Sequence, residues 1–327
     1  MRSPQTCSYP LERFEQPVDK CRYLNSFIVD YISRYQLFDD VERYTKIIGL
    51  FMRFCTPPNV SFRGLDAVCM FTTLSFFIDD QSDKGNNRYL ERYQEIITGK
   101  RSPVTQSENA LSELLDFAQQ LSESYRASAD SFRQHLLGYI TAQQWERECV
   151  NHSQGGFSIE DYRQYRPDAI ALFPYLALLK LSENIDESRF FPLQKSQLLF
   201  LEQLAAKIAY LDNDICSWES ERTDPTALNL IKIIKESSDL SWRDSFEEVL
   251  RLRNAAVELY SHNRDCARQV ESVLKPAALE STTPVLNQYL SLLECSVTGN
   301  LKAMSCLKLG QLRYQPSVSS LAMTAAL

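Results

Sequence analysis

Three aspartates stand at the end of an apolar stretch of the sequence. The segment FTTLSFFIDDQSDKGNN contains Asp79, Asp80 and Asp83. On a helix, Asp79 and Asp83 would share one face about 40° apart, with Asp80 about 100° from Asp79. Carboxylates at the C-terminal end of a helix oppose its dipole, and a divalent cation would offset this cost. The segment therefore predicts a Mg²⁺ site that also takes phosphate oxygens. The alternative is an ordinary acidic helix end that faces water.

A second set of oxygen-bearing side chains recurs at four-residue steps. The segment KIAYLDNDICSWESERTD places Asn213, Ser217 and Glu221 on a helix face only about 80° wide. An amide oxygen, a hydroxyl and a carboxylate are hard donors that suit a single Mg²⁺ ion. This spacing predicts a second metal site, and the alternative is the polar face of a solvent-exposed helix.

Helices must position both sets, because helical periodicity extends over nearly the whole chain. Only 9 of the 327 residues are glycine, and no repeat or linker stands out. We predict an all-α protein, with one domain over residues 1–314 and a loose tail over 315–327. The helix that opens at Ser158 should be interrupted near Pro167. The other expected helices cover residues 20–38, 40–54, 62–80, 86–98, 107–126, 129–150, 169–182, 195–220, 226–237, 241–272 and 283–309.

Bulk properties exclude several classes of partner. The net charge is -7 and no basic block occurs, so nucleic acid is not an expected partner. No stretch approaches about 18 apolar residues and no basic amphipathic helix is evident, so no membrane is expected. The N-terminus lacks the apolar core of a signal peptide, and we expect a cytoplasmic protein. The 9 cysteines then read as reduced thiols, and the 3 histidines are too dispersed for a His-rich metal site.

The two oxygen-rich segments resemble the aspartate-rich and NSE motifs of class I terpene synthases of the bacterial and fungal type. The second follows the first by about 130 residues. Arg166, in EDYRQYRPDAI, is similar to the family's pyrophosphate-sensing arginine, with Arg163 as the alternative. Arg313 and Tyr314 resemble its RY pair, and a preceding Gly-Asn-Leu segment is similar to one on the same helix of the family.

The resemblance implies a fold and a set of site residues. The fold would be a helical bundle around a central active-site cavity, and many members of the family form dimers, so a homodimer is conceivable here. Three Mg²⁺ ions are implied, two held by Asp79 and Asp83 and one by Asn213, Ser217 and Glu221, with Asp80 as a further candidate ligand. The diphosphate of the substrate would bind Arg166, Arg313, Tyr314 and Arg222. Ala169 and Ile170 would occupy the linker and effector positions at a helix break.

The implied reaction is cleavage of the C–O bond of an isoprenyl diphosphate, release of diphosphate and cyclisation of the allylic carbocation. Aromatic faces stabilise such a cation by about 0.5–2 kcal/mol each. Candidates for this role are Phe51, Phe76, Phe173 and Tyr210, and plain core packing is the alternative for each. Farnesyl diphosphate is slightly favoured as substrate over geranylgeranyl diphosphate, and the product stays open.

Other functions compete with this interpretation. A chain-elongating isoprenyl diphosphate synthase would share the fold, but it uses a second aspartate-rich motif where this chain has the NSE pattern. A non-catalytic helical interaction protein with a degenerate site is the alternative from another class. A helical-repeat scaffold is disfavoured because no fixed period appears.

Overall fold

Helices account for almost all of the regular structure in the computed structural model of the chain. The structure describes residues 15–83, 88–124, 129–152, 158–224, 227–274 and 283–309, and no strand occurs among them. The all-α prediction is therefore confirmed. The helices are α1 Val18–Tyr35, α2 Val41–Cys55, α3 Phe62–Asp83, α4 Arg88–Ile97, α5 Gln106–Ser124, α6 Ala129–His152, α7 Ile159–Ala169, α8 Leu172–Ser182, α9 Pro192–Glu221, α10 Leu230–Ser237, α11 Trp242–Leu274 and α12 Thr283–Leu309, with a 3₁₀ turn η1 at Glu187–Arg189.

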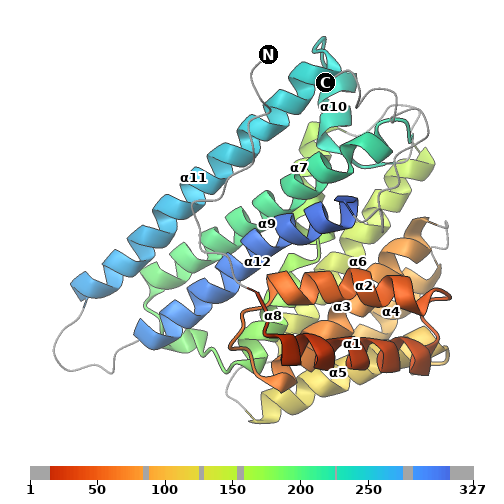
Figure 1. Cartoon of the computed structure of the whole chain (residues 1–327), viewed down its shortest axis with the longest axis vertical. Helices are drawn as coiled ribbons and strands as arrows, with labels where there is room; N and C mark the ends of the chain where they lie inside the picture. Colours follow the sequence, from red (N-terminus) through yellow and green to blue (C-terminus); the bar gives the residue numbers. More distant parts are fainter. Residues whose placement is uncertain are drawn as a thin grey trace.

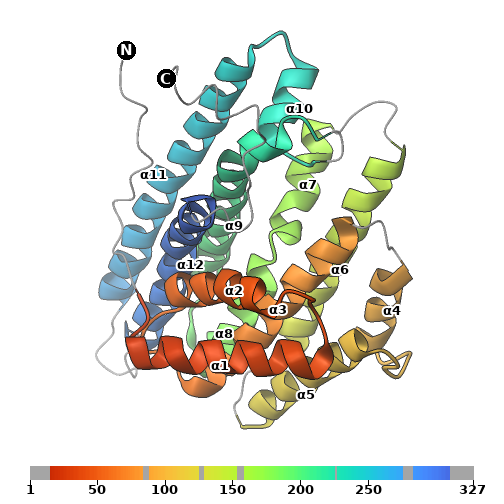
Figure 2. The ribbon, with the colours of Figure 1, turned by 45° about the vertical axis from the view of Figure 1, so that its right-hand side comes forward.

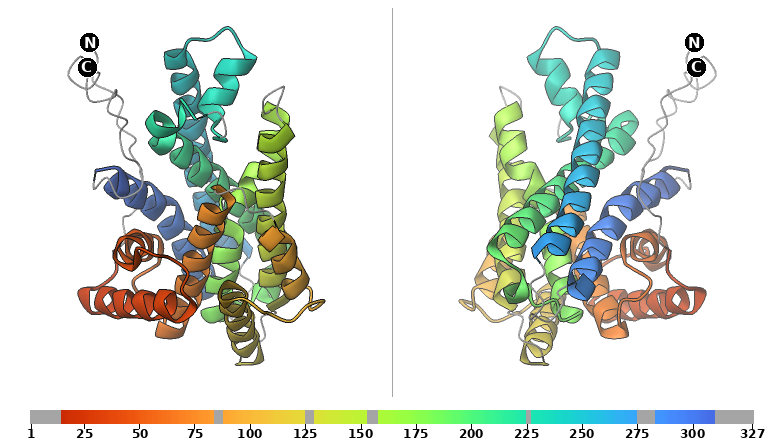
Figure 3. Two further views of the ribbon diagram at one scale, coloured as in Figure 1. Left: turned by 90° about the vertical axis from the view of Figure 1, so that its right-hand side faces the viewer. Right: turned by 90° about the vertical axis from the view of Figure 1, so that its left-hand side faces the viewer.

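The helices pack in two groups (Figures 1 and 2). Helices α9, α11 and α12 run alongside one another, and α2 crosses α12. In the other group α3 is central and packs against α1, α2, α5, α6 and α8. Helix α7 packs against α6 and also against α9 and α10, so it links the two groups, which Figure 3 shows from the side. The metal-motif helices α3 and α9 thus belong to different groups, and the site must form where the groups meet.

The helix break expected near Pro167 falls just after that residue. Helix α7 continues through Pro167 and ends at Ala169, two residues further on. A proline inside a helix removes one backbone donor. Here that loss falls near the end of the helix, and the Ile170 N–H still bonds to the Arg166 carbonyl at 3.2 Å. The chain turns instead at Ala171, whose φ of 62° is left-handed and unusual for a non-glycine residue.

One glycine allows α2 and α12 to cross closely. A Cβ atom at Gly299 of α12 would overlap the Phe54 carbonyl of α2 and lie 2.6 Å from the Cys55 nitrogen. Gly138 on α6 differs, because its added Cβ would meet only Asp168, at 3.5 Å or more. Only the first glycine is therefore required by packing.

Gly299→Ala is expected to lower the free energy of unfolding by about 3 kcal/mol or more, because two backbones must separate. Gly138→Ala should raise it by about 0.5–1 kcal/mol, because alanine favours helix more than glycine does. Urea denaturation of both variants measures the difference. Equal stability of the Gly299 variant and the wild type would refute the close-packing argument.

No helix in the described part of the chain is both long enough and apolar enough to cross a membrane.

Candidate active site

A cavity of about 600 Å³ opens between the two groups of helices. Its walls come from α2, α3, α6, α9 and α12 and from the turn between α7 and α8. The volume is within the usual range for small-molecule sites, about 300–1,000 Å³. Helix α3 lines the cavity from Phe71 to Asp80, nine residue steps that correspond to a depth of about 14 Å.

Helix α9 brings the NSE residues together. Asn213 and Glu221 line the cavity, and Ser217 lies buried between them. The Ser217 hydroxyl is 2.7 Å from Glu221 Oε2 and 2.9 Å from the Asn213 carbonyl, so it can donate to either. Burial raises the pKa of Glu221, and hydrogen bonds from Asn229 and Ser217 oppose that rise. The predicted four-residue spacing thus yields one compact face of oxygen atoms.

Helix α3 carries the aspartate motif on the facing wall. Asp79 and Asp80 both line the cavity. The Tyr44 hydroxyl on α2 donates a hydrogen bond to Asp80, which fixes the orientation of that carboxylate. Asp83 is the last residue of α3, and its side chain is outside the described part of the structure.

Arg166 enters the cavity from the last turn of α7. Its side chain is only 10% exposed. The Nη2 atom donates to Asn213 Oδ1 and to Asp214 Oδ1, each at 3.0 Å. Asp214 also accepts from the Tyr162 hydroxyl and, at 2.8 Å, from the Leu230 N–H. One buried carboxylate therefore connects the arginine, α9 and the start of α10.

A second aspartate on α9, two residues before Asp214, makes a different ion pair. Asp212 Oδ1 accepts from Arg253 Nε of α11 at 2.9 Å, and both side chains are fully buried. Neither residue lines the cavity. Asp212 and Asp214 thus form two buried pairs with arginine, one beside the cavity and one behind it.

The turn between α7 and α8 forms part of the cavity wall. Ala169, Ile170 and Ala171 all line it. Gln143 on α6 donates from Nε2 to the Ala169 carbonyl at 3.4 Å, a long hydrogen bond that links α6 to the turn. Ala169 and Ile170 are therefore at a helix break, as their predicted linker and effector positions require.

The aromatic candidates divide into two pairs. Phe51 and Phe76 line the cavity, and their ring centroids are 5.3 Å apart. Phe173 packs against His135 in the core instead. Tyr210 packs edge-on against Tyr162 in a second buried cluster. Neither Phe173 nor Tyr210 lines the cavity, and both belong to buried clusters.

For Tyr210 the reason is its angular position on α9. Its neighbour Ala209 lies on the same face as Asn213, four residues on, and both line the cavity. Tyr210 is rotated about 100° from Ala209, which turns its ring toward α7. Four further aromatic residues that the sequence did not single out line the cavity, and these are Tyr44, Phe71, Tyr139 and Tyr175.

The predicted diphosphate-binding cations are only partly within the described residues. Arg222 caps the C-terminal end of α9 and does not line the cavity. Arg313 and Tyr314 lie outside the described residues. Two arginines that were not predicted, Arg43 on α2 and Arg147 on α6, line the cavity together with Arg166. A lone arginine on a helix carries no sequence signal that would distinguish it from a surface charge.

The donor atoms fit a hard divalent cation. Asn213, Ser217 and Glu221 offer only oxygen, and the last two are in mutual contact. Among the described residues, no three His, Cys, Asp or Glu side chains converge on a metal site. The NSE set can still offer a metal ion three oxygen donors, because it combines one carboxylate with an amide and a hydroxyl.

Comparison with known proteins identifies the class. Residues 70–258, more than half of the chain, match the family model described as terpene synthase family 2, C-terminal metal binding. The chain therefore belongs to this family and is a terpene synthase, an enzyme of a metal-binding family, and the prediction of its class is confirmed. No curated protein sequence matches it.

Solved structures show the same fold at low sequence identity. Hedycaryol synthase superposes with a TM-score of 0.76 at 16% identity, covering 93% of this chain and 98% of that one. For α-eudesmol synthase the TM-score is 0.75 at 15% identity, with 93% and 99% coverage. Linalool/nerolidol synthase from Streptomyces clavuligerus gives 0.74 at 14% identity, with 91% and 99% coverage.

Proposed function

We propose that this terpene synthase is a Mg²⁺-dependent cyclase that ionises a linear isoprenyl diphosphate and closes the resulting carbocation into a ring. One observation carries the proposal: polar residues from three helices line a single cavity together with aromatic residues. Asp79 comes from α3, Asn213 and Glu221 come from α9, and Arg166 comes from α7. Oxygen donors that can hold Mg²⁺ and a buried arginine suit a diphosphate, and the aromatic and aliphatic lining suits a hydrocarbon chain.

The polar end of the cavity would hold the metal and the diphosphate. Asp79 and Asp83 are the proposed ligands for two Mg²⁺ ions, and Asn213, Ser217 and Glu221 are those for a third. Bound Mg²⁺ would supply Lewis-acid stabilisation of the leaving diphosphate. Arg166 would add charge-assisted hydrogen bonds to the diphosphate oxygens, because its planar guanidinium matches two of them at once.

The apolar part of the cavity would fold the chain and exclude water. A free allylic cation reacts with water at once, so the walls must be dry where the ring closes. Phe51 and Phe76 present adjacent rings on this surface and are the proposed cation-stabilising residues.

Farnesyl diphosphate is the proposed substrate, with geranylgeranyl diphosphate as the alternative. Either chain must fold within the cavity of about 600 Å³ for a ring to close, and the shorter chain needs less of this space.

The test is incubation with geranyl, farnesyl and geranylgeranyl diphosphates, each with and without Mg²⁺, followed by gas chromatography and mass spectrometry. A cyclic hydrocarbon or alcohol is expected from farnesyl diphosphate, only when Mg²⁺ is present. Removal of the metal with EDTA should stop turnover, and added Mg²⁺ should restore it, because carboxylates and a diphosphate repel one another without a cation.

Two results would contradict the proposal. Elongated products on addition of isopentenyl diphosphate would identify a chain-elongating synthase instead. Silence with every substrate, from protein whose circular dichroism is helical, would favour a non-catalytic interaction protein.

A further inference from the structure

Asn229 is a buried asparagine just after the NSE helix that the reaction described above does not use. It precedes α10 and is only 1% exposed. It does not line the cavity, so it has no access to substrate. Buried amides are normally fully hydrogen-bonded, and the partners of this side chain indicate what it does.

Every polar atom of the Asn229 side chain has a partner. Its Oδ1 atom accepts from the Ile231 N–H at 3.0 Å, which caps α10. Its Nδ2 atom is 2.9 Å from Glu221 Oε2 and 2.9 Å from the Asp214 carbonyl, so its two hydrogens serve these two acceptors. Ser217 Oγ lies at 3.4 Å from the same nitrogen.

Two of these contacts reach Ser217 and Glu221, the NSE residues whose side chains touch each other. Glu221 Oε2 accepts from Asn229 on one side and from the Ser217 hydroxyl on the other. The carboxylate is therefore restrained in rotation, with its position tied to the start of α10. Glu221 is the last residue of α9, so these contacts hold its side chain at the point where the helix ends.

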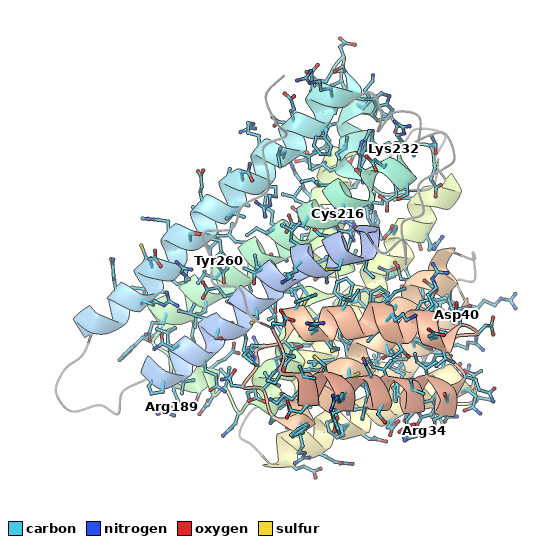
Figure 4. The ribbon with its side chains drawn as sticks, in the orientation of Figure 1. Arg34, Asp40, Arg189, Cys216, Lys232 and Tyr260 are labelled. Atoms are coloured by element: carbon cyan, nitrogen blue, oxygen red, sulfur yellow. The ribbon has the colours of Figure 1, made fainter. Side chains whose placement is uncertain are left out.

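The start of α10 is itself held firmly against α9. The Leu230 N–H bonds to Asp214 Oδ2 at 2.8 Å. Lys232, labelled on α10 in Figure 4, donates from Nζ to the Asp224 carbonyl at 2.7 Å. Asn229 is thus supported on both sides and can transmit a fixed orientation to Glu221.

We propose that Asn229 is a positioning residue for the metal site, holding Glu221 and Ser217 in the orientation in which they bind Mg²⁺. The inference rests on the proposed function, because it assumes that these residues are metal ligands. Groups that hold a metal ligand in place typically contribute 10- to 100-fold in metal affinity. A side chain with this role must donate to the ligand, and asparagine does so while its oxygen caps a helix.

The decisive variant is Asn229→Ser. Serine keeps a capping oxygen for α10, but its hydroxyl is too short to reach Glu221. Asn229→Thr keeps a cap with the same short reach and serves as a second variant. The matched control is Ser241→Ala, which removes the hydroxyl that accepts from the Asp244 N–H at the start of α11, away from the cavity.

The measurement is the rise in Tm of the full chain with increasing Mg²⁺ at fixed inorganic diphosphate. In both Asn229 variants the Mg²⁺ concentration for half of the rise should increase about 10- to 100-fold. In Ser241→Ala this Mg²⁺ concentration should equal that of the wild type, even if the variant has a lower Tm than the wild type without ligand. In turnover, the same variants should need more Mg²⁺ and should recover most of their rate when it is saturating.

The outcomes separate this inference from the proposed function. No Mg²⁺-dependent rise in wild-type Tm would remove the metal site and the inference with it. If the wild type shows the rise but the Mg²⁺ concentration for half of the rise is unchanged in the Asn229 variants, the positioning role alone is overturned. If those variants also have a lower Tm without ligand, Asn229 acts only as a helix cap.

Discussion

Replacing Asn213 with alanine is expected to lower kcat by about 10³-fold while the protein stays folded. The variant removes the amide oxygen proposed to bind Mg²⁺, and removal of one group that stabilises developing charge typically costs about 10²–10³ in kcat. It also removes one acceptor of Arg166, whose Nη2 is 3.0 Å from Asn213 Oδ1. The measurement is product formation from farnesyl diphosphate over a range of Mg²⁺ concentrations.

The fold should tolerate this change, because Arg166 keeps its second acceptor in Asp214. We expect a loss of stability of about 1 kcal/mol, the typical worth of one hydrogen bond. Asn263→Ala is the matched control, since that asparagine is also on a helix and bonds to the Leu259 carbonyl far from the cavity. Asp79→Ala, on the facing wall, should be as inactive as Asn213→Ala. Wild-type turnover and Mg²⁺ dependence in either site variant would remove the metal assignment.

Arg166→Lys is expected to have the second-largest effect, a fall in kcat of about 10²-fold. Lysine keeps the positive charge beside Asp214, so the buried carboxylate is not left without a partner. Nη2 alone donates to both Asn213 and Asp214, and lysine cannot reproduce the further N–H groups of the planar fork that suit phosphate oxygens. Steady-state kinetics with farnesyl diphosphate measure the change.

A buried arginine on the other side of α9 provides the control. Arg253 pairs with Asp212 as Arg166 pairs with Asp214, and both arginines are on helices next to α9. Arg253→Lys should lower Tm but leave kcat per folded molecule near that of the wild type, because Arg253 does not line the cavity. If the loss of kcat in each of the two variants simply follows its loss of Tm, Arg166 has a structural role only.

The buried network around α9 gives these experiments a common physical basis. Consecutive polar positions of α9 face alternately toward the cavity and toward neighbouring helices, so Asn213 and Glu221 reach the cavity while Asp212 and Asp214 reach Arg253 and Arg166. We expect the polar groups on the inner face to bind ligands and the charges on the outer faces to hold the helix in place. Substitutions on the two kinds of face should therefore separate activity from stability.

The sequence by itself determined the helical class, the two oxygen sets and the family. These features are local or periodic: residues at i, i+4 and i+8 share a helix face whatever the helix packs against. For that reason Asn213, Ser217 and Glu221 lie together as predicted, and the helix bounds agree to within a few residues at most ends.

Only the tertiary structure decided which residues meet across helices. Phe51 and Phe76 face the cavity while Phe173 and Tyr210 face the core, because periodicity does not give the rotation of a helix relative to its neighbours. Asn229, an unremarkable residue in the sequence, reaches Glu221 only because α10 begins beside the end of α9. Long-range contacts of this kind depend on the whole packed fold, and no single segment of the chain encodes them.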